Sequence, residues 1–443
     1  MKPELLSPAG TLKSMQYAFA YGADAIYAGQ PRYSLRVRNN EFNKEENLAQ
    51  AIQMAHAQGK QFYLATNLAP HNDKVRSFIR DMEPVIAMRP DALIMSDPGL
   101  IMLVREQWPE QIVHLSVQAN AVNWATVKFW QQQGIKRVIL SRELSLEEIA
   151  EIRQRVPEME LETFVHGALC IAYSGRCLLS GYMTHRDSNQ GACTNSCRWK
   201  YDTVEAKETL EGDIVAAQPA VQTFTPATQQ IENIQNKIFL LQEENRPGEY
   251  MPAYEDEHGT YIMNSKDLRA VQHVKKLAEI GVHSLKIEGR TKSHFYVART
   301  AQIYRQAIDD AAAGRDFDWK MMDALEGLAN RGYTEGFYRR HLPAEFQNYE
   351  QNTSLSATQQ FVGEALEYDR QRGMLTVAVK NRFAVGNTLE LMTPQGNHRF
   401  RLDALESSKG ERLEVAPGDG WQVKIPVPVA VDPEYALIMR NDS

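Results

Sequence analysis

Long apolar runs are missing from this chain, and cysteine is scarce. No eighteen consecutive apolar residues occur in its 443 residues, and only four residues are cysteine. The missing runs argue against a membrane-spanning helix. The opening residues, MKPELLSPAG, have no continuous apolar stretch or small-residue cleavage site of the kind that marks a secretory signal. We therefore expect a cytoplasmic protein with no membrane partner, in a compartment where clustered cysteines more often bind metal than form disulfides.

An excess of positive charge is also missing. Lysine and arginine number 49 against 56 aspartates and glutamates, so the net charge is −7. This balance excludes a nucleic-acid binder that relies on overall positive charge, and any RNA contact must use a local basic patch. The hydrophobic fraction of 43% and the charged fraction of 24% are typical of a globular protein. The length allows one large α/β domain and an appended unit.

Short apolar runs rich in Ile, Leu and Val alternate with helical patterns over most of the chain, as in a parallel sheet with crossover helices. The expected strands are residues 4–6, 24–29, 61–67, 91–96, 112–118, 137–141, 160–166 and 282–287. Eight such strands favour a TIM-type (β/α)8 barrel over a doubly wound sheet. We expect this barrel to occupy residues 1–345.

Two segments depart from the barrel pattern. The spacer at about 170–263 is too long for an ordinary connection, so it predicts an inserted lobe after the seventh strand, and it contains every cysteine. From residue 360 to 443, short alternating runs are separated by Gly, Asn, Pro and Asp, which predicts a small C-terminal β-barrel domain. The boundary is expected within 348–359.

The cysteines cluster strongly. Random placement would put all four within about thirty residues only about once in a thousand trials, counted from their positions. Four thiolates suit a 4Fe–4S cluster or a structural zinc ion. Zinc sites usually pair ligands as Cys-x2-4-Cys, whereas the first two cysteines here are separated by six residues, so the cluster is favoured and zinc is the lesser alternative. The remaining interpretation of the cysteines is that they are free thiols or form a disulfide. The expected ligands are Cys170, Cys177, Cys193 and Cys197.

Polar residues at the carboxyl ends of barrel strands are candidates for a substrate site. These candidates are Ser7, Asn67, Gln118, Arg142, His166, Glu288 and Arg290. Arg142 and Arg290 suit a small dicarboxylate through bidentate pairing, although salt bridges to Glu143 or Glu288 are the alternative. His166 is the candidate catalytic residue because imidazole can donate a proton, but a structural histidine is the alternative.

The segment 32–38 combines three arginines with an aromatic residue. Arg32 and Arg38 are candidate RNA-binding residues, because arginines contact phosphates and Tyr33 would stack on a base. A solvated loop is the alternative reading.

Several blocks carry a resemblance to a known family. The stretch from Glu162 to Cys170, continuing through Cys177 to Ser180, resembles the signature of the collagenase-like peptidase family, the thirty-second of the unassigned peptidase families. Similar family blocks stand at 4–10, 34–36, 286–290 and 330–337, so the resemblance covers nearly the whole chain. Arg36 lies in one of these blocks and is a further candidate for substrate binding.

The barrel half is most similar to family members that modify tRNA. This resemblance implies a 4Fe–4S cluster held by the four cysteines, a requirement for prephenate, and conversion of the wobble uridine to 5-hydroxyuridine, but it does not identify an electron donor. The family name suggests a peptidase instead, yet the sequence has neither G-x-S-x-G nor H-E-x-x-H. A non-catalytic RNA-binding scaffold with a structural cluster is the third reading.

Overall fold

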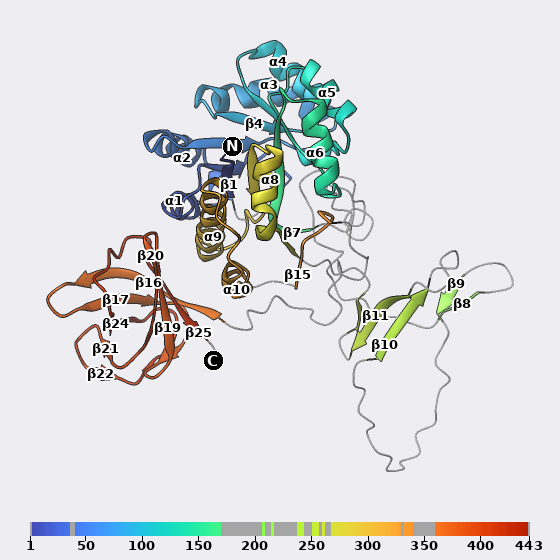
Figure 1. Ribbon diagram of the computed structural model, residues 1–443. Helices are drawn as coiled ribbons and strands as arrows, with labels where there is room; N and C mark the ends of the chain where they lie inside the picture. The colour runs from blue at the N-terminus through green and yellow to red at the C-terminus, as the bar shows by residue number, and fades with distance from the viewer. Residues whose placement is uncertain are drawn as a thin grey trace.

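The computed structural model describes residues 2–35, 40–169, 267–328, 332–339 and 359–441, together with the backbone of five short strands between 206 and 261. Eight parallel strands form the centre of the molecule (Figure 1). They are β1 (Glu4–Pro8), β2 (Ala25–Gly29), β3 (Gln61–Ala65), β4 (Ala92–Met95), β5 (Val113–Leu115), β6 (Arg137–Ile139), β7 (Glu160–Ala168) and β14 (Ser284–Ile287).

The eight strands close into a barrel through β14. Ser284 pairs with Glu4 of β1 on one side and with Glu162 of β7 on the other. Nearly every residue of each strand is buried, because helices cover the outer face of the barrel. The predicted TIM-type barrel is confirmed, and all eight expected strands are present.

Helices connect the strands around the outside of the barrel. They are α1 (Leu12–Ala20), α2 (Glu45–Ala57), α3 (Asn72–Ala87), α4 (Pro98–Gln107), α5 (Trp124–Gln132), α6 (Leu146–Arg155), α8 (Val274–Ile280), α9 (His294–Ala312) and α10 (Lys320–Glu326). Short 3-10 turns are η1 (Glu41–Asn43), η2 (Val117–Ala119) and η5 (Val271–His273). Local capping explains several boundaries: Ser145 and Glu148 form a capping box on α6, and Gly22, at φ +99°, follows α1.

Two short strands extend the sheet beyond β7. β13 (Asp267–Arg269) pairs antiparallel with β7, and β15 (Tyr333–Thr334) pairs with β13. The predicted lobe contributes β8 (Ala206–Glu208), β9 (Ile214–Ala216), β10 (Lys237–Gln242), β11 (Tyr250–Asp256) and β12 (Gly259–Tyr261). The rest of the segment from 170 to 266 lies outside the described residues.

The C-terminal domain is antiparallel. Its strands are β16 (Gln359–Asp369), β17 (Met374–Val379), β18 (Phe383–Ala384), β19 (Thr388–Thr393), β20 (Gly396–Arg401), β21 (Leu405–Ser407), β22 (Arg412–Leu413), β23 (Val415–Ala416), β24 (Gln422–Pro426) and β25 (Leu437–Asn441). Eight of them form one sheet in the order β20-β19-β25-β16-β17-β24-β21-β22. This sheet curls around its own apolar core, as expected for the small β domain (Figure 1). The predicted boundary at 348–359 falls almost wholly outside the described residues.

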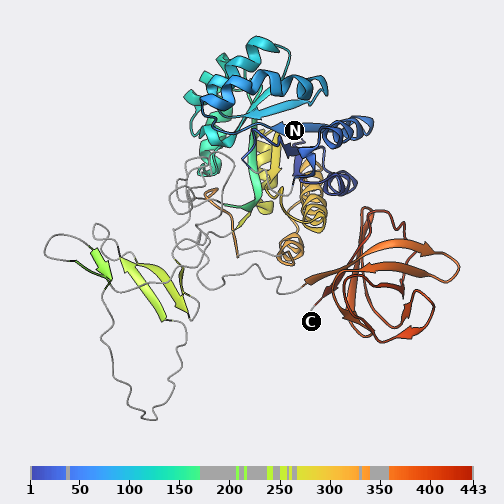
Figure 2. The ribbon, with the colours of Figure 1, turned by 180° about the vertical axis from the view of Figure 1, so that it is seen from behind.

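The C-terminal domain packs against α1 and α9 of the barrel, as the reverse view also shows (Figure 2). Met392, Leu437 and Met439 are fully buried and join the hydrophobic core of the barrel. A buried ion pair crosses the contact, with Arg299 Nη2 2.5 Å from Glu390 Oε1. The described domains therefore share apolar and charged contacts.

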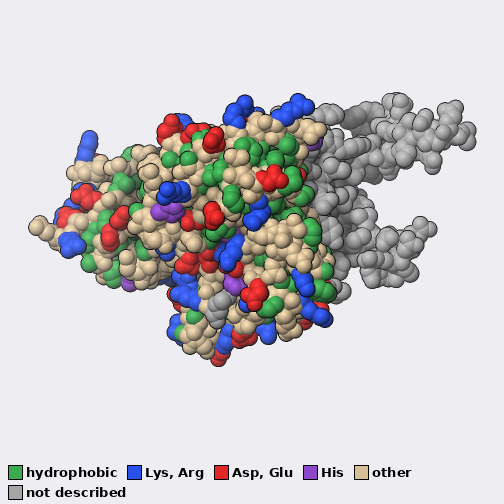
Figure 3. All heavy atoms as spheres, turned by 90° about the horizontal axis from the view of Figure 1, so that it is seen from above, with side chains coloured by type: hydrophobic (Ala, Val, Ile, Leu, Met, Phe, Trp, Pro, Cys, Tyr) green, Lys and Arg blue, Asp and Glu red, His purple; other side chains and the backbone are tan. Residues whose placement is uncertain are grey.

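The surface has no large division of charge in the view from above. Acidic and basic side chains of the described residues are interspersed over that face (Figure 3). Among the described helices, none is both long enough and apolar enough to cross a membrane.

Candidate active site

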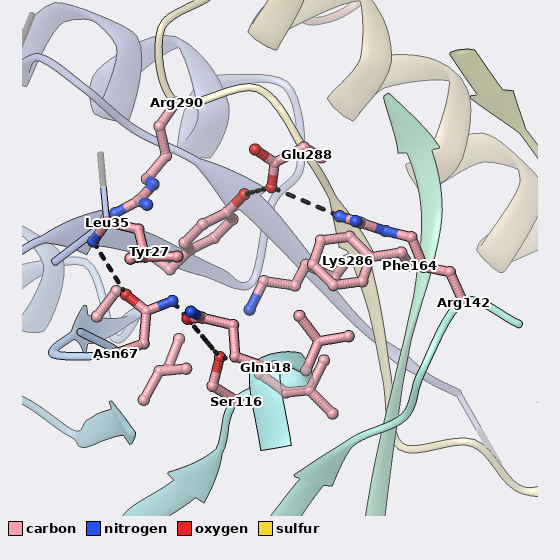
Figure 4. Close-up of a pocket in the computed structure, with 14 residues that line it drawn as sticks. Tyr27, Leu35, Asn67, Ser116, Gln118, Arg142, Phe164, Lys286, Glu288 and Arg290 are labelled. Carbon is pink, nitrogen blue, oxygen red and sulfur yellow. Dashed lines mark hydrogen bonds and ion pairs between the residues drawn. The ribbon is translucent and has the colours of Figure 1, made fainter. Parts of the chain in front are cut away.

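A cavity opens at the carboxyl ends of the barrel strands, where enzymes of this fold place their active sites. It measures about 630 Å³ including the solvent at its open mouth. Its lining residues come from all around the barrel (Figure 4): Tyr27, Leu35, Ala65, Asn67, Ile94, Ser116, Val117, Gln118, Ile139, Arg142, Phe164, Lys286, Glu288 and Arg290. Five of the predicted substrate-site residues are among them, namely Asn67, Gln118, Arg142, Glu288 and Arg290.

Amide and hydroxyl groups line one side of the cavity. Asn67 Nδ2 lies 3.5 Å from Ser116 Oγ, and Asn67 Oδ1 accepts a hydrogen bond from the Leu35 amide at 3.4 Å. Gln118 belongs to the short turn η2, whose start is capped by Ser116. These contacts orient neutral donors and acceptors toward a ligand.

Charged groups line the other side. Arg142 Nη2 is 4.0 Å from Glu288 Oε2, and its guanidinium carbon lies 3.9 Å from the centre of the Phe164 ring. Glu288 also accepts a 3.0 Å hydrogen bond from Tyr27. Arg290 donates to Ser34 Oγ at 2.9 Å. Both readings left open for Arg142 thus remain physically compatible, because a 4.0 Å ion pair leaves a guanidinium able to bind a carboxylate as well.

Lys286, which the strand-end argument missed, forms part of the cavity lining. Its side chain is only 3% exposed, and Nζ lies 2.8 Å from Glu162 Oε1 and 4.3 Å from the centre of the Tyr27 ring. Burial lowers the pKa of the Lys286 amine, and the Glu162 carboxylate opposes that shift. The spacing of Lys286 from Glu288 was the available signal, because side chains two residues apart on a strand share a face and Glu288 was already predicted to face the site.

A buried charged layer lies beneath the cavity. Arg137 is 2.7 Å from Glu4, 3.0 Å from Glu160 and 3.3 Å from Glu162. Although burial acts against its charge, the Glu4 and Glu162 carboxylates raise the pKa of Arg137, which stays protonated. Burial together with the nearby cations lowers the pKa of His114 in the same layer, so this histidine is neutral.

His166, the predicted catalytic candidate, does not line the cavity. The pairing of β7 with β14 shifts register beside it, a bulge that can re-aim a side chain. Its ring packs among Tyr296, Tyr304 and Tyr333 and is 1% exposed. Tyr304 donates its hydroxyl proton to the Val165 carbonyl, so His166 Nδ1 is the donor in the 3.3 Å contact with Tyr304. Burial lowers the pKa of His166 to about 3. These surroundings fit the alternative interpretation, in which His166 is a structural histidine.

Ser7 is also absent from the cavity lining. Glu4 points into the barrel toward Arg137, so alternation along β1 directs Ser7 toward the surrounding helices. Ser7 is fully buried, and its hydroxyl has no hydrogen-bond partner among the described residues.

The predicted basic segment is a turn where it is described. Tyr33 is fully buried and donates to Asp81 Oδ2 at 2.7 Å, so the prediction that it stacks on a base is wrong. Arg32 forms an ion pair with Asp81 at 2.6 Å, although half of its side chain is exposed. Arg36 and Arg38 lie outside the described residues.

All four predicted cysteine ligands lie outside the described residues as well. Within the part of the chain that is described, no three His, Cys, Asp or Glu side chains are placed to hold a metal ion. The chemistry of the donor set nevertheless fits an iron–sulfur cluster, since four thiols follow β7 within a short stretch of sequence. Their convergence stays a prediction.

Comparisons with known proteins identify the family. Residues 10–348 match peptidase family U32, and residues 357–440 match the C-terminal domain of that family. The tRNA hydroxylation protein P of Escherichia coli is 66% identical over 100% of this chain and 97% of its own length. The protein of the same name from Haemophilus influenzae is 62% identical over 99% of this chain and 96% of its own length. The 23S rRNA 5-hydroxycytidine C2501 synthase of E. coli is 27% identical over 94% of this chain and 56% of its own length. The chain belongs to peptidase family U32.

Proposed function

We propose that this chain is an enzyme that hydroxylates tRNA, converting the wobble uridine to 5-hydroxyuridine. The observation that carries the proposal is the full-length identity of 66% to a protein named for tRNA hydroxylation. The more distant relative is named for making 5-hydroxycytidine in rRNA, which is also a pyrimidine hydroxylated at position 5. The cavity at the mouth of the barrel is the place where this fold carries out chemistry.

The proposed cofactor is a 4Fe–4S cluster held by Cys170, Cys177, Cys193 and Cys197, with zinc as the lesser alternative. A bound cluster would supply one-electron chemistry next to the cavity, because the cysteine segment follows β7 directly. A cytoplasmic location, where thiols stay reduced, suits this cofactor.

The proposed co-substrate is prephenate, a small dicarboxylate. Arg142 and Arg290 lie at the cavity and would bind its carboxylates, while Asn67 and Gln118 offer hydrogen bonds to its hydroxyl group. Ile94, Ile139 and other apolar lining residues exclude water from its ring.

A peptidase finds less support in the same cavity. Its lining, as far as the chain is described, includes neither histidine nor cysteine, and its one serine, Ser116, contacts the amides of Asn67 and Gln118. Ser116 is thus bonded to amide groups, and none of its hydrogen bonds within the described residues joins it to a basic side chain that could activate it as a nucleophile.

The test is nucleoside analysis of tRNA from cells that lack the endogenous hydroxylation proteins and carry this chain. We expect 5-hydroxyuridine with the unmodified chain and loss of it with Cys193→Ser or Cys197→Ser. Trp319→Ala is the matched control, because that side chain is 67% exposed and does not line the cavity. Anaerobic purification with iron and sulfide analysis tests the cofactor separately. Full 5-hydroxyuridine in the cysteine variants would refute the role of the cluster, and its absence with the unmodified chain would refute the function.

A further inference from the structure

A lysine, its carboxylate partner and two aromatic rings meet at the floor of the cavity. We propose that Lys286 is a catalytic residue whose amine condenses with the carbonyl of a small 2-oxo acid to form an iminium ion. The inference rests on the proposed function only in taking this cavity as the substrate site.

The position of the amine carries the proposal. Lys286 projects from β14 into the cavity, and Figure 4 shows it between Tyr27 and Phe164. Nζ is 4.3 Å from the centre of the Tyr27 ring and 5.5 Å from that of Phe164. The amine is thus walled by aromatic rings and meets the ligand space. An amine desolvated in this way loses its proton more readily than one in water, and so becomes a nucleophile.

Glu162 is the proton acceptor. Its carboxylate lies 2.8 Å from Nζ and has no exposed surface. Glu162 is also 3.3 Å from Arg137, so Lys286 is not its sole counter-charge. Arg137 already neutralises the charge of Glu162 without reaching the cavity. Lys286 differs from Arg137 because it lines the cavity as well as pairing with Glu162.

The other lining groups select a 2-oxo acid. Arg142 and Arg290 provide guanidinium groups for the carboxylate beside the carbonyl. The charges of Glu288 and Arg290 act on the pKa of Lys286 in opposite directions, since Glu288 raises it and Arg290 lowers it. Apolar residues such as Leu35, Ile94 and Val117 suit the carbon chain.

The step balances without an oxidant or a reductant. Lys286 gives one ammonium proton to Glu162, and the nitrogen lone pair bonds to the carbonyl carbon while the C=O π electrons move to oxygen. A second nitrogen proton passes to that oxygen, the proton on Glu162 follows, and the C–O bond breaks to release water. The product is an iminium cation that keeps one N–H next to the Glu162 carboxylate, so the buried ion pair survives the reaction.

The test is reductive trapping on the full-length chain, purified anaerobically. The protein is incubated with pyruvate and sodium cyanoborohydride, and the adduct is located by peptide mass spectrometry. We expect the adduct at Lys286 and its suppression by excess succinate, which has carboxylates but no ketone. Lys60→Arg is the matched control, because Lys60 is partly buried and bonded to the Ala23 carbonyl, away from the cavity.

Lys286→Arg keeps the cation but cannot form the iminium ion, so tRNA hydroxylation should fall by more than about 100-fold in a variant that still folds. An adduct spread evenly over surface lysines, or no adduct at Lys286, would overturn the proposal even if the variant fails to fold. Normal hydroxylation by Lys286→Arg would also overturn it. Trapping at Lys286 in a chain that never hydroxylates tRNA would instead refute the proposed function alone.

Discussion

Replacing Arg299 should loosen the attachment of the C-terminal domain to the barrel. The side chains of Arg299 and Glu390 are 3% and 5% exposed, and their 2.5 Å contact joins α9 to β19. Gln359 bonds to both partners, at 3.1 Å and 3.2 Å. Burial acts to raise the pKa of Glu390, yet the Arg299 guanidinium holds it below its ordinary value. Both groups are therefore charged at neutral pH.

The expected cost follows from which partners remain. Breaking a buried ion pair from one side costs about 3–5 kcal/mol because a charge is left buried. Arg299→Met leaves Glu390 with Arg399, 3.2 Å away, so we expect the lower end, about 3 kcal/mol. Glu390→Leu leaves Arg299 with Gln359 and no carboxylate, so we expect about 4 kcal/mol. The double variant should cost less than either single variant, because no unpaired charge remains in the contact.

The assay is scanning calorimetry together with urea unfolding. The single variants should separate the unfolding of the C-terminal domain from that of the barrel, because the ion pair couples them. Trp319→Ala serves again as the exposed control. Single-variant costs below about 1 kcal/mol that add up in the double variant would show that this pair contributes little, and the reasoning would fail.

Three further predictions concern the cavity, a carboxylate at the contact between the domains, and the arginine segment. Arg290→Ala should reduce 5-hydroxyuridine in tRNA while leaving the iron content unchanged, since Arg290 lines the cavity; normal levels would assign it a structural role. Hydrogen bonding from His294, 3.1 Å away, is the main cause that lowers the pKa of Glu364 to about 2, and Lys13 adds to it. The stabilisation from this carboxylate is therefore complete above the ordinary pKa of 4.5 and is lost as pH falls toward 2. Glu364→Gln should accordingly cost about 2 kcal/mol at pH 7 and little at pH 2, and an equal cost at both would contradict this assignment. Arg32→Ala with Arg38→Ala should weaken tRNA binding and flatten its salt dependence by about one unit for each lost phosphate contact; an unchanged slope would place the RNA surface elsewhere.

The barrel was predictable because its strands are short, apolar and separated by helical patterns, so each strand could be located independently. The same geometry predicted that strand-end residues such as Asn67, Gln118 and Arg142 would meet around one cavity. Lys286 was missed because the predicted site residues are those that end or follow a predicted strand, whereas Lys286 lies inside the predicted strand 282–287. Its partner Glu162 lies on another strand and could not be paired with it without the register.

One error arose where the backbone departs from regular pairing. Alternation along β7 would have turned His166 inward with Phe164, but the bulge opposite Ile287 places it among tyrosines of the outer layer. Tyr33 was expected at the surface because its neighbours are arginines. It is instead buried against α3, where Phe78 packs edge-on at 5.0 Å. Such tertiary contacts leave no mark in local composition.

The late position of β14 has a consequence for biosynthesis. The seventh strand ends at Ala168, whereas the closing strand begins only at Ser284. At about 5–20 residues per second, a ribosome needs roughly 6–23 s to make the intervening chain. During that time β1 and β7 are both unpaired edges of a nascent sheet, and the partly buried acid Glu4 lacks its hydroxyl partner Ser284. The cysteine segment is thus synthesised while the barrel is still open, and chaperones have their longest opportunity to act before β14 closes it.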